Sequence, residues 1–230
     1  VDVQGISIIG LGTGSLQPRI DFNHADSDFF VAADDVTIEN IHFSATVTGV
    51  KIGVSVLTGA TNTVIRNCRF DVETTTTDEF LIACNYGVGC NNFLFENNVI
   101  DMGLGGAETG VKLVGATAGG TIRNNRIVGD YSLACIAGLT TASTEIYILD
   151  NLLVQGNSAN VGAVAVISMV AASTGVVQGN TGFCNVATVV LAWVSTGMFF
   201  GQNFTGEVAG SAEEACLNST ATSVTAHADD

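Results

Sequence analysis

The sequence predicts an all-β fold: a single-stranded right-handed parallel β-helix of about seven coils with an Asn ladder. The first observation is a short pattern that recurs along the chain, as VTIENIHF (36–43), TVIRNCRF (63–70), FLFENNVI (93–100), TIRNNRI (121–127) and ILDNLLV (148–154). When these copies are aligned on one Asn, they lie 27, 30, 27 and 27 residues apart. A nearly fixed period of this length indicates a stacked repeat architecture.

The second observation is that each repeat has the composition of strands. The segments alternate at period 2 and are rich in Val, Ile, Thr and Gly, whereas helical repeats need amphipathic stretches. The leucine-rich consensus L-x-x-L-x-L is absent from the sequence. A second Gly-flanked apolar segment lies between consecutive copies, at 49–54, 79–84, 109–115, 133–139, 162–169 and 187–194. Each coil is therefore expected to hold two or three short strands, and the crossover rule predicts the right hand.

Several columns of like residues are expected on the stacked coils. Apolar residues stand two before and three after each aligned Asn and should face the core; in the fifth copy they are Leu149 and Val154. The aligned residues themselves predict a hydrogen-bonded ladder at a turn, made by Asn40, Asn67, Asn97, Asn124 and Asn151. The residues immediately before them alternate in charge, as Glu39, Arg66, Glu96, Arg123 and Asp150. Neighbouring coils lie about 5 Å apart, so this alternation predicts a charge ladder that fixes the stacking register.

The chain is expected to form one domain whose two ends are closed. Residues 1–35 are expected to enter and cap the stack, and residues 36–205 to form the coils. The polar, acidic segment 206–230 is expected to be a tail that caps the other end. Such caps are needed because unpaired strand edges recruit other chains.

The charge balance limits the partners. Asp and Glu number 22 against 7 Lys and Arg, which gives a net charge of −15. A nucleic-acid binder needs basic surface to replace phosphate counterions, and an anionic membrane would repel this chain for the same reason. The longest apolar stretches, 161–172 and 186–200, are shorter than the roughly 20 residues that span a bilayer. We therefore expect neither a nucleic-acid nor a membrane partner.

The cysteines predict no metal centre. None of the six forms a C-x-x-C pair, and three His residues are too few to suggest a zinc site. The thiols are expected to be free, although Cys84 and Cys90 are close enough in sequence to leave a disulfide open. No cofactor is predicted.

These residues carry a family resemblance. The opening GISIIGLGTGS (5–15), together with VTIENIHF and TIRNNRI, resembles the pectate-lyase-like right-handed β-helix superfamily over about residues 3–205. That superfamily includes lyases, hydrolases, adhesins and phage virion proteins, so the resemblance implies a fold and leaves several functions open. The Ala/Thr/Gly-rich coils and TIRNNRIVGD (121–130) resemble more narrowly the β-helix proteins of tailed phages.

Asp71 and Asp101 are the best candidates for chemistry. Both stand four residues after an aligned Asn, so they should be neighbours on adjacent coils. Two close carboxylates can share a proton, hold a cation or act as a glycosidase pair. Glu73 and Asp130 could join them, which makes these four residues weak candidates for a metal site. The alternative is a solvated acidic edge, which acidic patches usually form.

A catalytic base for a lyase reaction is missing from the sequence pattern. Lys51 and Lys112 fall in the second strand segment, away from the acidic edge. Arg69 and Arg126 are expected to face outward near the charge ladder, and His42 to be a plain surface residue. No catalytic residue is therefore predicted, with Asp71 and Asp101 as the alternative.

The late coils predict an interface. Residues 151–206 contain no charged residue, although a coil buries only its inward side chains. A free surface normally carries charges, so one face of these coils is expected to pack against other chains. The candidate contact residues are Trp193, Met198, Phe199 and Phe200, and side-by-side packing of parallel β-helices predicts a homotrimer.

Together these observations predict a non-enzymatic virion structural protein of a tailed phage. The specific expectation is a trimeric capsid decoration (cement) protein on the capsid surface, in contact with a capsid or other virion protein. One alternative is a polysaccharide lyase, hydrolase or tailspike-type depolymerase. The other is an extracellular glycan-binding surface or filament protein.

Overall fold

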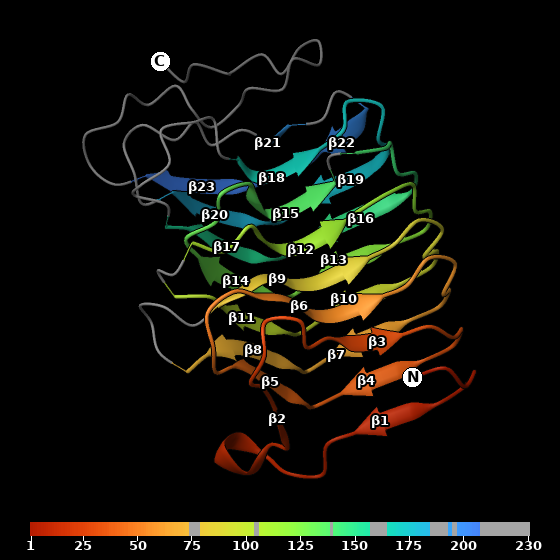
Figure 1. The fold of residues 1–230 in the computed structure, drawn as a ribbon. Helices are drawn as coiled ribbons and strands as arrows, with labels where there is room; N and C mark the ends of the chain where they lie inside the picture. The colour runs from red at the N-terminus through yellow and green to blue at the C-terminus, as the bar shows by residue number, and fades with distance from the viewer. Residues whose placement is uncertain are drawn as a thin grey trace, which may run out of the picture.

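The computed structural model describes residues 1–73, 79–103, 106–138, 140–156, 165–184, 193–194 and 197–207. It is an all-β solenoid of parallel strands, as predicted (Figure 1). Three sheets of eight, eight and seven strands run along the stack, which agrees roughly with seven coils. The described helical structure is one short 3-10 turn, η1 (Gly14–Leu16), and no described helix is long and apolar enough to cross a membrane.

Each coil contributes one strand to each sheet, in the order A, B, C. Sheet A consists of β1 (Ser7–Ile9), β4 (Thr37–Glu39), β7 (Val64–Arg66), β10 (Leu94–Glu96), β13 (Thr121–Arg123), β16 (Ile146–Leu149), β19 (Gly175–Gln178) and β22 (Met198–Phe200). Sheet B consists of β2 (Arg19–Phe22), β5 (His42–Ala45), β8 (Arg69–Val72), β11 (Val99–Asp101), β14 (Arg126–Gly129), β17 (Leu152–Gln155), β20 (Thr181–Cys184) and β23 (Phe204–Glu207). Sheet C consists of β3 (Phe29–Val31), β6 (Val50–Val56), β9 (Phe80–Tyr86), β12 (Thr109–Leu113), β15 (Ala134–Gly138), β18 (Ala165–Met169) and β21 (Trp193–Val194).

The structure describes the N-terminal end of the stack more fully than the C-terminal end. Residues 1–35 supply β1, β2 and β3, and these strands stack below β4, β5 and β6. We call the coils from β1 to β15 the lower coils and those from β16 onward the upper coils, as they stand in Figure 1. Of the predicted tail, only residues 206–207 lie within the described part, where they end β23.

The recurring sequence pattern is a strand of sheet A, a sharp bend and a strand of sheet B. We call this bend the corner turn. Its first residue is left-handed, with φ between 54° and 71°, a conformation that Asn, Asp and Gly adopt with least strain. These residues are Asn40, Asn67, Asn97, Asn124, Asp150 and Gly179. The strands of sheet A from β4 to β19 therefore turn into sheet B at the same level of their coils, whereas β1 is followed by the loop around η1.

Inward side chains form the predicted apolar columns. In sheet A, Ile38, Ile65 and Phe95 pair in register and are fully buried. In sheet B, Phe43 stacks on Phe70 with ring centroids 5.0 Å apart. Stacked rings and β-branched side chains fill the narrow interior, so the hydrophobic core runs the length of the described coils.

The fifth repeat corrects the predicted alignment by one residue. Arg123 pairs with Leu149, so the corner turn of that coil begins at Asp150, with φ 54°, and not at Asn151. Ile148 and Leu153 are consequently the buried residues, whereas Leu149 and Val154 are only partly buried. The local period is therefore 26 residues. The predicted alignment differs by one residue because an alignment on a single Asn cannot distinguish the two positions of the turn.

The buried Asn ladder occupies the second position of the corner turn. Its members are Asn98, Asn125, Asn151 and Asn180, which are buried, and Asn203, which is partly buried. The side-chain oxygen of Asn125 accepts the backbone N–H of Asn98 at 2.9 Å, and its amide nitrogen donates to the carbonyl of Phe95 at 2.9 Å. Of the predicted ladder, only Asn151 belongs to this column; the other four residues occupy the left-handed position beside it.

Candidate functional site

The predicted charge column exists in sheet A as two ion pairs. Glu39, Arg66, Glu96 and Arg123 are successive partners in the strand register. Arg66 Nη2 lies 2.8 Å from Glu39 Oε2, and Arg123 Nη2 lies 2.7 Å from Glu96 Oε2. Asp150 does not extend the column, because Leu149 occupies that place above Arg123. Each coupled pair joins two neighbouring coils.

Asp71 and Asp101 are direct partners in the register of sheet B, but each carboxylate has its own arginine. Arg69 Nε donates to Asp71 Oδ2 at 2.8 Å, and Arg126 Nη1 lies 3.5 Å from Asp101 Oδ2. The Asp71 side chain is 15% exposed, and that of Asp101 is 42% exposed. The two acids are therefore neighbours that are each engaged by a cation.

His42 has a more specific place than a plain surface residue. Its Nε2 lies 2.7 Å from Asp71 Oδ1, and its side chain is only 18% exposed. The two oxygens of Asp71 are thus divided between His42 and Arg69. An imidazole held by a carboxylate is a common acid–base arrangement, and it is also a common structural contact.

A groove of about 760 Å³ opens beside this cluster. One wall is the loop around η1, which Asn40 holds by donating to the carbonyls of Gly10 and Gly12 at 2.6 Å each. Gln17 Nε2 also donates to the carbonyl of Asn67, at 3.3 Å. The lining residues are Gly14, Ser15, Gln17, Arg19, His42, Asn67, Cys68, Arg69, Asp71, Asn97 and Val99. The groove combines amide, guanidinium and imidazole groups with one carboxylate.

A second hollow, of about 390 Å³, lies on the same corner in the upper coils. Its lining is less charged and consists of Leu149, Asp150, Gln178, Gly179, Gln202 and Phe204. The corner between sheets A and B is thus concave at two levels. Its chemistry changes along the stack, from arginines and acids below to amides and apolar groups above.

The remaining metal candidates are not brought together. Glu73 Oε1 lies 3.8 Å from Arg19 Nη2, so it belongs to another ion pair. Asp130 follows β14, where its backbone N–H donates to the carbonyl of Gly103, and burial raises the pKa of its carboxyl group. Within the described ranges, no group of three or more His, Cys, Asp or Glu side chains is placed to hold a metal ion.

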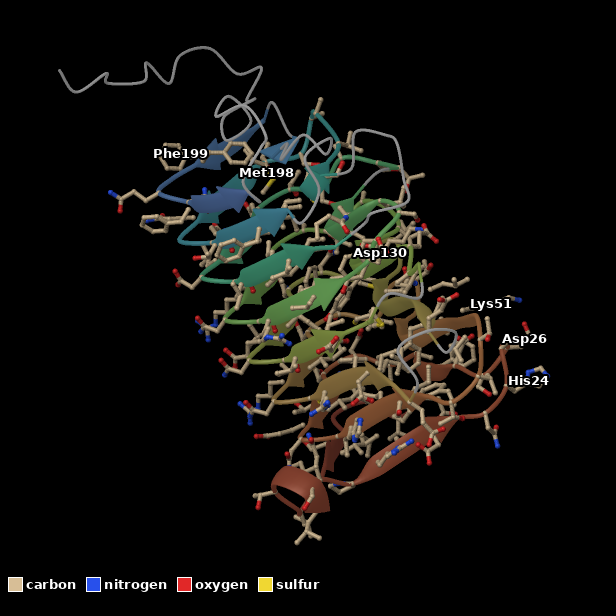
Figure 2. The ribbon with its side chains drawn as sticks, turned by 90° about the vertical axis from the view of Figure 1, so that its left-hand side faces the viewer. His24, Asp26, Lys51, Asp130, Met198 and Phe199 are labelled. Atoms are coloured by element: carbon tan, nitrogen blue, oxygen red, sulfur yellow. The ribbon has the colours of Figure 1, made fainter. Side chains whose placement is uncertain are left out.

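Both lysines lie in sheet C, away from the groove. Lys51 Nζ is 2.5 Å from Asp26 Oδ1, and Lys112 pairs with Glu108. Figure 2 shows Lys51, Asp26 and His24 together at the outer surface, on the opposite side of the view from Phe199. Neither lysine is therefore placed near Asp71.

The predicted interface residues divide between the inside and the outside. Phe199 is 66% exposed and lies at the outer edge of the upper coils (Figure 2). Met198 is 5% exposed, and Phe200 packs against the core, because residues on either side of Phe199 point inward. The prediction was wrong for Met198, whereas Phe200 is only partly buried and stays a prediction, and the side chain of Trp193 lies outside the described residues.

Other large apolar side chains are exposed in the upper coils, and one of them, Phe204, lines the upper hollow. We call the set formed by Tyr147, Leu152, Phe183, Phe199 and Phe204 the apolar corner; each is at least 37% exposed. Tyr147 and Phe199 share a column of sheet A, through Val176. Leu152 and Phe204 share a column of sheet B, through Thr181. Sequence alone located this region by its lack of charge but could not assign its outward residues.

Four cysteines are buried and form no disulfide: Cys68, Cys84, Cys90 and Cys135. The disulfide left open between Cys84 and Cys90 is not formed. Burial raises the pKa of the Cys68 thiol to about 11, and it also raises the pKa of Cys90. These thiols are therefore small core residues with little thiolate at neutral pH.

Comparisons with protein-family models, with curated proteins and with solved structures give no match.

Proposed function

We propose that the chain is a non-enzymatic structural protein that works by assembling with other proteins. The observation that carries this proposal is the apolar corner, where five large apolar side chains are exposed together in the upper coils. Large apolar side chains grouped on one corner of a fold mark protein interaction sites, and aromatic residues are enriched at the centres of such sites.

The specific form that we propose is a trimeric capsid decoration protein of a tailed phage. The resemblance of the repeats to phage β-helix proteins supports this form. The architecture supports it as well, because backbone ladders and buried amides tie every described coil to the next. A rigid stack with short corner turns suits a shell that meets the environment.

The test of this form is the location of the protein on an intact particle. Antibody labelling of purified virions, viewed by electron microscopy, should place the protein on the capsid surface. Labelling of the tail would contradict the decoration role, and particles without label would contradict the virion role.

A glycan-acting protein is the second candidate, and the placement of His42 against Asp71 in the lower groove favours it. In this alternative, the groove binds a saccharide and the pair provides acid–base chemistry, with Asp101 on the adjacent strand.

Acidic and neutral polysaccharides should be incubated with the protein and with the variants Asp71→Asn, Asp101→Asn and His42→Gln. Cleavage by the wild type that is lost in the Asp71 and His42 variants would replace the structural proposal with an enzymatic one. Asp26→Asn is the matched control, because this acid pairs with Lys51 in sheet C, away from the groove.

A further inference from the structure

We infer that the outer surface of sheets A and B is the face through which copies of this chain associate, side by side and with parallel stack axes. The inference rests on the proposed assembly function and names the partner of its apolar corner as a second copy. Three observations carry it: the neutralised charge of this face, the position of the apolar corner and the area that the face offers.

The charge of the face is balanced, although the chain is strongly acidic. All five arginines of the sequence lie on sheets A and B, and each pairs with at least one carboxylate; Arg19 also lies 3.8 Å from Glu73. The pairs are Arg19–Asp21, Arg66–Glu39, Arg69–Asp71, Arg123–Glu96 and Arg126–Asp101. With Glu73, these five cations and six anions sum to −1, so 2 basic and 16 acidic residues outside these ion pairs carry the other −14 of the net charge.

This distribution of charge favours association of two copies through this face over association through any other face. Two chains of charge −15 repel each other wherever their unpaired acids meet, and like-charge contacts across an interface are costly. On the face of sheets A and B, the described charges are locally paired in the lower coils. In the upper coils the same face is nearly uncharged around Tyr147, Phe199 and Phe204, so copies can approach there without that repulsion.

The upper hollow gives the contact a shape. Leu149 and Gln178 line it from sheet A and the exposed Phe204 lines it from sheet B, while Phe199 is exposed on β22 of sheet A. An exposed aromatic side chain of one copy can therefore enter the hollow of its neighbour. A contact between two different parts of the same face is heterologous, and such contacts form a ring, such as the proposed trimer, when the rotation between copies closes.

The available area favours parallel axes. Across the corner, eight residues span about 20 Å once the bend is included. The three upper coils rise about 14 Å, so their part of the face offers a flat area on the order of 300 Å². A stable specific interface needs about 800 Å² per partner. Eight stacked strands rise about 38 Å, so the whole face offers on the order of 800 Å². Parallel axes let the lower coils contribute, whereas a contact through the upper coils alone is too small.

The test compares Phe199→Glu and Phe204→Glu with the wild type by analytical ultracentrifugation over a concentration series. Each variant buries a carboxylate in the proposed contact, so we expect the midpoint concentration for association to rise at least about 30-fold, as for an interface hot spot. Phe30→Glu is the matched control: this residue is 47% exposed on β3 of sheet C and should leave association unchanged. Thermal unfolding of all three variants shows whether the fold is intact.

The outcomes separate this inference from the proposed function. A wild-type oligomer that persists in both variants would show that copies meet through another face, while an assembly role would stand. A wild-type monomer at all concentrations would overturn self-association. If particle incorporation were then lost in Phe199→Glu, the occupant of the apolar corner would be a different virion protein. Small-angle scattering tests the extent of the contact, because copies that pack along the whole face form a particle no longer than one stack.

Discussion

Two adjacent residues of each corner turn have different physical tasks. The first adopts a left-handed conformation, as in Asn124 with φ 55°, and its side chain faces the outside. The second is buried, as in Asn125, and its amide bonds to the coil below. Asn suits the first position through its backbone tolerance and the second through its donor and acceptor groups. A repeat that reads Asn–Asn therefore hides two independent columns.

Replacement of the buried amide should destabilise the stack. Asn125→Ala leaves the backbone N–H of Asn98 and the carbonyl of Phe95 buried without these partners. Each such group costs about 1–3 kcal/mol, so we expect the free energy of unfolding to fall by about 3 kcal/mol. Denaturant titration followed by circular dichroism measures the change. Asn124→Gly at the neighbouring left-handed position is the control and should change the free energy by less than about 0.5 kcal/mol.

The buried thiols should be inert in the folded protein. A thiolate is the reactive species, and burial raises the pKa of Cys68 to about 11. We therefore expect Cys68, Cys84, Cys90 and Cys135 to remain unmodified by Ellman's reagent at pH 8, and to react once guanidinium unfolds the chain. Mass spectrometry of peptides identifies the modified residues. Rapid native modification of any of these four would contradict their placement in the core.

At the scale of the strand, the alternation of apolar residues predicts where the strands lie, but it predicts their pairing register only in part. Alternating apolar residues predicted the columns of sheets A and B in the first four repeats, because one residue of slip would turn a strand inside out. In the fifth repeat, ILDNLL can be aligned on Asp150 or on Asn151, and only the inward side chains of Ile148 and Leu153 decide between them. Alignment of Asp150 and Asn151 with the Asn–Asn pairs of the earlier repeats gives the observed register.

The site was less predictable than the strands. Asp71 and Asp101 were expected as neighbours, because adjacent coils place equal positions side by side. The contact of His42 with Asp71 is diagonal across β5 and β8, so no single column contains it. The groove depends on the loop around η1, which has no counterpart in the repeat and whose path is set by contacts with Asn40. Repeat patterns cannot predict such a loop.

The paired charges of sheet A predict a measurable effect at this scale. Glu96 is 9% exposed, and both Nε and Nη2 of Arg123 contact its Oε2, at 2.8 and 2.7 Å. Arg123→Glu would place two carboxylates at neighbouring register positions, where like charges destabilise a sheet. Since Arg123 is partly exposed, we expect a modest loss of about 1–2 kcal/mol in the free energy of unfolding.

Salt and a neutral variant provide the controls for that prediction. About 0.5 M NaCl shortens the screening length and should restore part of the stability of Arg123→Glu. Arg123→Gln removes the ion pair without adding a charge, so its loss should be smaller. Equal losses in the two variants would show that repulsion from Glu96 contributes little.

At the scale of the whole molecule, each described coil contacts chiefly the coils above and below it, as the strand pairing shows. Stability in such a solenoid is approximately a sum over coils and their interfaces, so removal of one coil should be tolerated when every column stays in register. The sixth coil, which contributes β16 to sheet A, offers the test. Its residues lie 26 positions after their partners in the coil below, whereas the repeat before it has a spacing of 27.

Deletion of residues 121–146 joins Gly120 to Tyr147, places Asn151 above Asn98 and sets Leu153 over Ile100. Gly120 keeps its place over Phe93, whose ring leaves no room for a side chain there, since an added Cβ would lie 2.1 Å from it. We expect this variant to fold, with a β-rich circular dichroism spectrum and a lower melting temperature.

Deletion of residues 121–147 removes one residue more, turns Ile148 outward and should give an insoluble or unfolded chain. If both deletions folded equally well, the inward columns would not determine the stacking of the coils.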